Sequence, residues 1–168
     1  MPLADVQSTF AISASLAVVI GVIIGLLQLR SQNRLRQVDI VMRLYSSFEQ
    51  EEFARHYLRL ARWKYKTYRA YRKRHSSEDS VSFFVVGTFF EGLGLLLKRN
   101  LAPIALLDDL LSGPILEMWP KVRPIVLGIR EELHQPARFE WFEFLYERMN
   151  ARMGHLKPTS PPRKSGPA

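Results

Sequence analysis

The longest apolar stretch of the chain runs from Phe10 to Leu29, FAISASLAVVIGVIIGLLQL, and contains no charged residue. Twelve of its 20 residues are Phe, Ile, Leu or Val, and each of these gains roughly 0.3–0.6 kcal/mol at the centre of a membrane. A helix of this length reaches about 30 Å, the thickness of a bilayer's hydrocarbon core. The pattern therefore predicts a transmembrane helix over residues 10–29, after an extracytoplasmic N-terminus of residues 1–9.

Two other interpretations of this stretch remain open: a buried helix of a soluble domain, and a cleaved signal peptide. A long soluble helix normally keeps a polar face, and a signal peptide normally has a basic segment before a shorter apolar one. Here the preceding residues carry one charge, Asp5, and all 24 Lys and Arg residues follow the stretch, beginning at Arg30. The positive-inside rule then predicts a single-pass protein of the cell (inner) membrane, with its N-terminus outside and residues 30–168 in the cytoplasm.

After residue 30, apolar residues recur at helical spacing and no segment alternates with the period of a strand. The sequence predicts an all-α protein, with a cytosolic bundle of about five helices over residues 30–153. We expect the first helix to continue past the membrane to about residue 46. The later helices are expected at 49–73, 80–99, 103–112, 114–134 and 136–153. The Pro-, Ser- and Gly-rich residues 154–168 predict a disordered basic tail.

Several local signals set these boundaries. Ser46 and Ser47, followed by Glu49 and Gln50, are typical of a capping box. The polar residues 75–80 offer N-caps for the next helix. Gly113 is expected to end the helix that begins near 103, and Gly154 the last helix. Pro120 and Pro124 lie within the helix predicted over 114–134 and are expected to kink or divide it. The last helix is expected to bury Phe139, Phe142, Leu145 and Met149.

The segment 80–99 is apolar on nearly all sides, which predicts the central core helix. A second membrane span is the competing interpretation, but Glu91 lies within it, and a carboxylate at mid-membrane is costly. A buried carboxylate must be paired, hydrogen-bonded or protonated. Arg123, Arg130 and the indole of Trp119 are candidate partners, and we predict a buried pair between Glu91 and Arg130. A catalytic or switching role for Glu91 is the alternative.

The net charge of +8 is concentrated after the membrane segment, because residues 30–75 hold 13 Lys and Arg against 4 Asp and Glu. Between Arg55 and Arg74 there is no acidic residue, and Trp63, Tyr65, Tyr68 and Tyr71 are interleaved. Such a segment suits a solvated face, anionic lipid headgroups or single-stranded nucleic acid. If its helix returned antiparallel to the first, Arg69–Arg74 would meet the bilayer. The candidate binding residues are Arg62, Lys64, Lys66, Arg69, Arg72, Lys73 and Arg74.

The membrane segment has small residues at every fourth position: Ser13, Ala17, Gly21 and Gly25. Such a face lets two membrane helices approach closely, so a homodimer through it is possible. The chain has no cysteine, which removes disulfides, thiolate metal sites and cysteine nucleophiles. Enzyme motifs are absent or incomplete, and the sequence predicts no catalytic residue, no metal site and no cofactor.

Three groups of residues resemble a family of uncharacterised small bacterial and archaeal single-pass membrane proteins with a cytosolic helical domain of unknown function. The first is Arg34-Leu-Arg36 with Val38 and Phe48. The second is the segment FFEGLGLL at 89–96, and the third is Trp119 with Arg130. The resemblance implies the fold and the membrane anchor but no activity.

We therefore expect a non-enzymatic, membrane-anchored interaction or regulatory module that contacts anionic headgroups and an unknown protein partner. A nucleic-acid-binding protein at the membrane surface, and an enzyme that uses a buried Glu91–arginine pair, are the alternatives.

Overall fold

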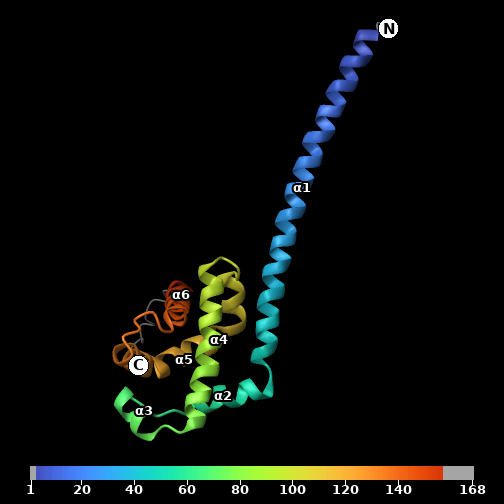
Figure 1. Cartoon of the computed structure of the whole chain (residues 1–168). Helices are drawn as coiled ribbons and strands as arrows, with labels where there is room; N and C mark the ends of the chain where they lie inside the picture. Colours follow the sequence, from blue (N-terminus) through green and yellow to red (C-terminus); the bar gives the residue numbers. More distant parts are fainter. Residues whose placement is uncertain (1–2, 157–168) are drawn as a thin grey trace, which may run out of the picture. The chain divides into compact units, whose positions relative to one another are not determined.

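A computed structural model describes the backbone of residues 3–156 and the side chains of residues 20–30, 32 and 35–154. Every secondary-structure element in this range is a helix and no strand occurs in it, which confirms the predicted all-α class (Figure 1). The helices are α1 (Leu3–Phe48), α2 (Glu51–Ala61), α3 (Tyr68–Arg74), α4 (Ser77–Lys98), α5 (Ile104–Glu132) and α6 (Glu140–Leu156). The chain divides into two compact units, Met1–Ile40 and Val41–Ala168.

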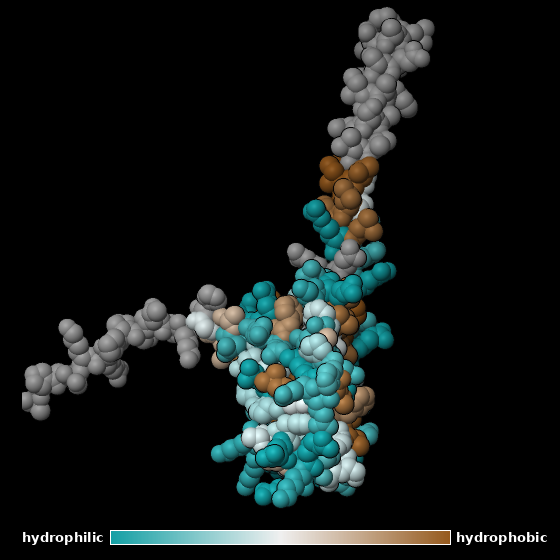
Figure 2. Space-filling model, turned by 60° about the vertical axis from the view of Figure 1, so that its left-hand side comes forward, coloured by the Kyte–Doolittle hydropathy of each residue, from teal (hydrophilic) through white to brown (hydrophobic). Residues whose placement is uncertain are grey.

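In the first unit, α1 is a continuous helix, as predicted, because no proline interrupts it after Leu3. Its described apolar side chains from Ile20 to Leu29 are about half exposed (brown in Figure 2). A Cβ atom at Gly21 or Gly25 would meet nothing within 4 Å. The side chains of Ser13 and Ala17, the other two members of the predicted dimer face, lie outside the described residues.

Among the described residues, the one helix long and apolar enough to cross a membrane is α4, and not the predicted N-terminal segment. Only the second half of the stretch 10–29 has described side chains. In the most apolar window of α4, 44% of the residues are buried inside the protein. It packs against α2 and α6, so it occupies the central core position that the sequence predicts for it.

The contact of α4 with α6 depends on two glycines spaced two turns apart. A Cβ atom at Gly87 would come within 2.8 Å of the Phe139 ring, and one at Gly94 would overlap the carbonyl oxygen of Trp141. Between these glycines, Phe90 stacks on Phe142 with ring centroids 4.8 Å apart. The predicted buried face of the last helix is confirmed, since Phe139, Phe142, Leu145 and Met149 are all buried.

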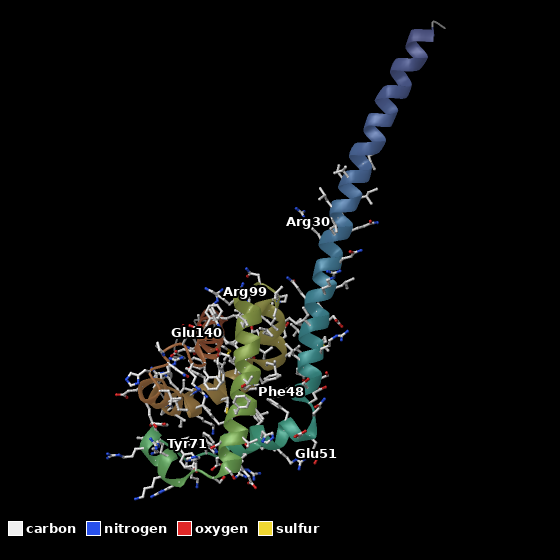
Figure 3. All side chains as sticks on the ribbon, in the orientation of Figure 1. Arg30, Phe48, Glu51, Tyr71, Arg99 and Glu140 are labelled. Atoms are coloured by element: carbon white, nitrogen blue, oxygen red, sulfur yellow. The ribbon has the colours of Figure 1, made fainter. Side chains whose placement is uncertain are left out.

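The last turns of α1 belong to the second unit and pack through aromatic rings. Val41 is fully buried. The Phe48 ring lies 5.2 Å from Phe53 of α2 and 5.8 Å from Phe89 of α4. Phe53 and Phe89 are themselves 4.7 Å apart. Three helices therefore share one aromatic cluster; its member from α1, Phe48, is labelled in Figure 3.

The predicted helix over 49–73 is wrong, because α2 ends at Ala61 and α3 begins at Tyr68. The predicted capping box is also wrong. The Ser46 and Ser47 hydroxyls donate to the Arg43 carbonyl oxygen within α1, while Gln50 is the N-cap of α2 and makes no side-chain capping bond. An N-cap between residues 75 and 80 is confirmed, since Ser76 and Asp79 form a capping box at the start of α4.

The division of residues 103–134 into two helices is wrong as well. Helix α5 runs through Gly113 and contains Pro114, Pro120 and Pro124. Each proline removes one backbone hydrogen bond, but the helix buries eight side chains along its length, and this burial offsets the loss. The last helix begins later than predicted, after Phe139 with its positive φ of 56°, and continues past Gly154 to Leu156. Most of the predicted tail, residues 157–168, lies outside the described residues.

Replacing Gly94 with alanine tests the close approach of α4 and α6. The new methyl group would overlap the Trp141 carbonyl, and overpacking of this kind costs about 1–3 kcal/mol. The control is Gly92→Ala, whose Cβ meets nothing within 4 Å; it should be neutral or stabilise by up to about 1 kcal/mol, since alanine favours helix. Circular dichroism during thermal unfolding measures both. Equal melting temperatures for the two variants would contradict the packing described.

Candidate functional site

The segment from Arg62 to Arg74 carries the seven predicted binding residues, and the structure exposes the side chain of every one of them. Residues 62–67 between α2 and α3 are not helical. In this stretch Arg62, Lys64 and Lys66 are exposed, whereas Trp63 and Tyr65 are partly buried against the core. This alternation with a period of two residues places the cations on one side and the aromatic rings on the other.

The aromatic side chains of this segment form an inward-facing cluster. The Trp63 ring lies 5.2 Å from Tyr65, 5.3 Å from Tyr71 and 6.1 Å from Phe83 of α4. Tyr71 is buried (labelled in Figure 3). Rings used in this way leave little open face on which a nucleic-acid base could stack. The interleaved aromatic residues, which suggested nucleic acid in the sequence, are explained by packing.

A buried carboxylate, Asp79, fixes the start of this segment. Its Oδ1 accepts hydrogen bonds from Arg59 Nε at 2.7 Å and from the Trp63 indole at 3.3 Å. Its Oδ2 accepts from the Tyr65 hydroxyl at 3.0 Å and from the Ser76 backbone N–H at 3.1 Å. One side chain of α4 therefore holds α2, the extended stretch and its own helix start together.

These hydrogen bonds set the ionisation of Asp79. Burial raises the pKa of its carboxyl group, but the bonds from the Ser76 N–H, Arg59 and Tyr65 lower it by more, so that the pKa falls from 3.8 to about 2. The carboxylate is therefore charged at every pH above that range.

The end of the segment is held by α5. Gly128 has no side chain, which leaves room for the Tyr68 ring against the backbone of α5. Arg72 forms an ion pair with Glu132 at 2.5 Å. The single helix returning antiparallel to α1, which would bring Arg69 and Arg74 back to a bilayer, does not form in the described structure. Contact with lipid must therefore rest on the charge and exposure of the segment itself.

Six of the seven cations form no ion pair with a described acidic side chain, so their charge can act on a ligand. Within the described part of the chain, Arg72 is the one member with an ion-pair partner. The segment Arg62–Arg74 is therefore an exposed cationic surface on a fixed backbone, which can contact phosphate and carboxylate groups. We call these residues the cationic surface: Arg62, Lys64, Lys66, Arg69, Arg72, Lys73 and Arg74.

An open groove of about 970 Å³ lies between α2 and the first turns of α4, and Arg62 is one of the residues that line it. Inside it, His56 Nδ1 and the buried Ser82 hydroxyl are 2.9 Å apart. Sequence reasoning missed this pair because His56 has no neighbouring ligand in the sequence. The one available signal was that Ser82 lies on the buried face of the core helix, where a hydroxyl needs a partner.

The predicted direct pair between Glu91 and Arg130 does not form. Glu91 Oε2 instead accepts a hydrogen bond from the Phe142 backbone N–H at 2.8 Å, so this carboxylate caps the first turn of α6. Burial raises the pKa of Glu91, while the backbone bonds from α6 and the charge of Arg130 oppose that rise. Arg130 pairs with Glu143 at 2.7 Å and donates to the Arg138 carbonyl oxygen. The partner of Glu91 is thus a backbone amide and not a cationic side chain, and the spacing of residues in the sequence could not reveal this.

No group of three or more His, Asp or Glu side chains gathers as metal ligands among the residues whose side chains are described. Asp108, one of two adjacent aspartates, is paired with Arg152 of α6 at 2.5 Å.

A family described as a domain of unknown function, DUF4760, matches residues 15–149 of the chain. The match covers most of the chain, which therefore belongs to this family. It agrees with the expectation of an uncharacterised family, whose description records no activity. No curated protein and no solved structure gives a significant match.

Replacing Asp79 with asparagine should destabilise the second unit, because the amide cannot satisfy the Arg59 guanidinium as a carboxylate does. Losing a charge-assisted hydrogen bond costs about 1.5–3 kcal/mol. The native pKa is depressed, so the contribution of Asp79 is complete above its ordinary value of 3.8 and is lost as the pH falls towards about 2. Urea unfolding of both proteins across this range measures the difference. The exposed Asp109→Asn is the control, and a gap between wild type and Asp79→Asn that persists unchanged at pH 2 would contradict this account.

Proposed function

We propose that this chain is a non-enzymatic, membrane-anchored helical module, held in the cell membrane by residues 10–29 and contacting anionic headgroups through its cationic surface. The single observation that carries the proposal is the exposed cationic surface, six of whose seven charges lack an acidic partner among the described residues. Exposed cations near a membrane contribute about 1 kcal/mol each in attraction to anionic lipid.

The anchor is supported by composition and by exposure. Residues 10–29 hold no charge, and the Ile, Leu and Val side chains between Ile20 and Leu29 are about half exposed. Continuous exposed apolar surface of this kind indicates contact with lipid or protein. The arginines that begin at Arg30 favour an orientation with residues 30–168 in the cytoplasm.

The cationic surface favours lipid over nucleic acid for a structural reason. Headgroups require exposed positive charge and no stacking platform. Single-stranded nucleic acid uses both charge and open aromatic faces, and here Trp63 and Tyr71 pack on each other and on Phe83. The exposed positive charges of the segment therefore match the requirements of a lipid surface better than those of a nucleic acid.

Two arginines placed within the apolar stretch test the anchor. Val22→Arg with Ile23→Arg replaces two favourable residues by two that each cost about +3 kcal/mol at a helix centre. The full-length wild type should stay in the membrane pellet after alkaline carbonate extraction, and the double variant should appear in the supernatant. Val22→Leu with Ile23→Leu is the control and should stay in the pellet. Release of the wild type by carbonate would overturn the anchor.

Reversing two charges tests the cationic surface. The full chain is reconstituted in nanodiscs of phosphatidylcholine, with or without 30% phosphatidylserine, and amide hydrogen exchange of residues 62–76 is followed. Phosphatidylserine should slow exchange in the wild type, and Lys64→Glu with Lys66→Glu should abolish that slowing. A matched reversal of two exposed arginines elsewhere, Arg123→Glu with Arg148→Glu, should leave it unchanged. Equal exchange of the wild type in both kinds of disc would argue against headgroup contact.

A further inference from the structure

Helix α4 has an exposed apolar stripe that no described helix covers. Val81 is 52% exposed, Phe84 60% and Leu95 38%. Thr88 and Gly92, which lie between them in the sequence, are exposed as well. We call these five residues the α4 stripe.

The spacing of the α4 stripe is that of a helix–helix seam. Its positions follow one another at intervals of three or four residues, which keeps them on one side of the helix. The contacts of α4 with α2 and α6 use its other sides, through buried residues such as Ser82, Phe90 and Gly94. A Cβ atom at Gly92 would meet nothing within 4 Å, so the stripe has a large side chain at one position and an open recess at another.

We propose that the α4 stripe binds the same stripe of a second copy of this chain, antiparallel and across a two-fold axis at Thr88. Thr88 lies midway in sequence between Val81 and Leu95, and also midway between Phe84 and Gly92. In an antiparallel pair centred there, Val81 lies level with Leu95 of the second copy, and Phe84 lies level with the recess at Gly92. A two-fold contact needs a surface that is complementary to itself, and these two pairings make the stripe self-complementary.

The charges at the two ends of α4 favour the antiparallel direction. The first turn of α4 contains Glu78, its last residue is Lys98, and Arg99 is its C-cap; all three are exposed. The Lys98 ammonium lies 5.5 Å from the centre of the Phe144 ring of α6, so Arg99 is the cation without such a contact among the described residues. An antiparallel partner brings Glu78 level with these cations, whereas a parallel partner brings like charges together. The Glu78 side chain is 74% exposed even though it pairs with Arg59 at 2.6 Å, so it can meet a second cation. Opposed helix dipoles favour the same direction.

The interface that one helix face can form is small, so the proposed dimer also depends on the membrane anchor. Stable dimers in solution bury about 800 Å² on each partner, more than five residues of one helix supply. Two copies held in one bilayer meet at a high effective concentration. The dimer therefore rests on the proposed membrane anchor and is expected to be weak in its absence.

Disulfide trapping tests the geometry directly, because the chain has no cysteine of its own. Full-length Thr88→Cys is reconstituted in vesicles of phosphatidylcholine and phosphatidylserine and is treated with a mild oxidant. Thr88 lies on the two-fold axis, so most of the protein should become a covalent dimer. The exposed Asn150→Cys on α6 is the control and should give at least tenfold less dimer.

The direction of the pair is tested by two further variants. Val81→Cys alone should give little dimer, but mixed with Leu95→Cys it should crosslink readily. Crosslinking of Val81→Cys with itself would overturn the antiparallel arrangement. In the Thr88→Cys protein, Phe84→Glu should lower the dimer yield at least tenfold, whereas Asn150→Glu should not; an unchanged yield with Phe84→Glu would overturn the role of the stripe. Circular dichroism checks that each variant is folded.

Absence of a Thr88→Cys dimer in protein that resists carbonate extraction overturns the proposal and leaves the anchor standing. Quenching of a fluorophore at position 88 by nitroxide-labelled lipid, without crosslinking, would instead assign the stripe to the bilayer. If carbonate releases the chain, the anchor has failed. Thr88→Cys is then oxidised at high protein concentration in detergent, where a dimer still supports the α4 contact and its absence overturns it.

Discussion

The close approach of α4 and α6 is the constraint on which the second unit depends. Because Gly94 has no side chain, the backbone of α6 at Trp141 reaches the surface of α4, and Gly87 leaves room for the Phe139 ring just before α6. Glu91, between the two glycines in the sequence, can then accept the Phe142 N–H. The same approach brings Phe90 and Phe142 into contact. A larger residue at Gly94 would push the backbone of α6 away from α4 and leave the Phe142 amide without its acceptor. Glycine, carboxylate and aromatic side chains thus act as one packing unit.

This packing arrangement explains why the central helix could be predicted from the sequence, whereas the hydrogen-bond partner of Glu91 could not. The apolar composition of residues 80–99 was enough to predict a core helix, and the spacing of Phe142, Leu145 and Met149 was enough to predict the buried face of the last one. The identity of the group opposite Glu91 depends on a backbone amide 51 residues away. Charge patterns in a sequence point to side-chain partners, and a backbone donor leaves no such mark.

The prediction of a single helix over residues 49–73 was wrong for a different reason. Residues 49–73 contain no glycine or proline, so local propensity favoured one helix. Trp63 and Tyr65 are both drawn towards the core, and residues two apart cannot share one side of a helix. Tertiary packing around Asp79 therefore overrides propensity and produces the extended stretch. The same packing explains why all seven cations are exposed, because the aromatic rings between them take the places next to the core. Along α5, burial likewise outweighed the effect of its three prolines, of which Pro120 and Pro124 were expected to kink or divide the helix.

The depressed pKa of Asp79 has a consequence for how this protein can respond to its surroundings. Its carboxylate stays ionised throughout the acidity that living cells experience. Mild acidification of the surroundings would therefore leave the junction of α2, α4 and the extended stretch intact. A chemical change that alters this region would have to act on the exposed amines and guanidinium groups instead, for example by acetylation of the lysines.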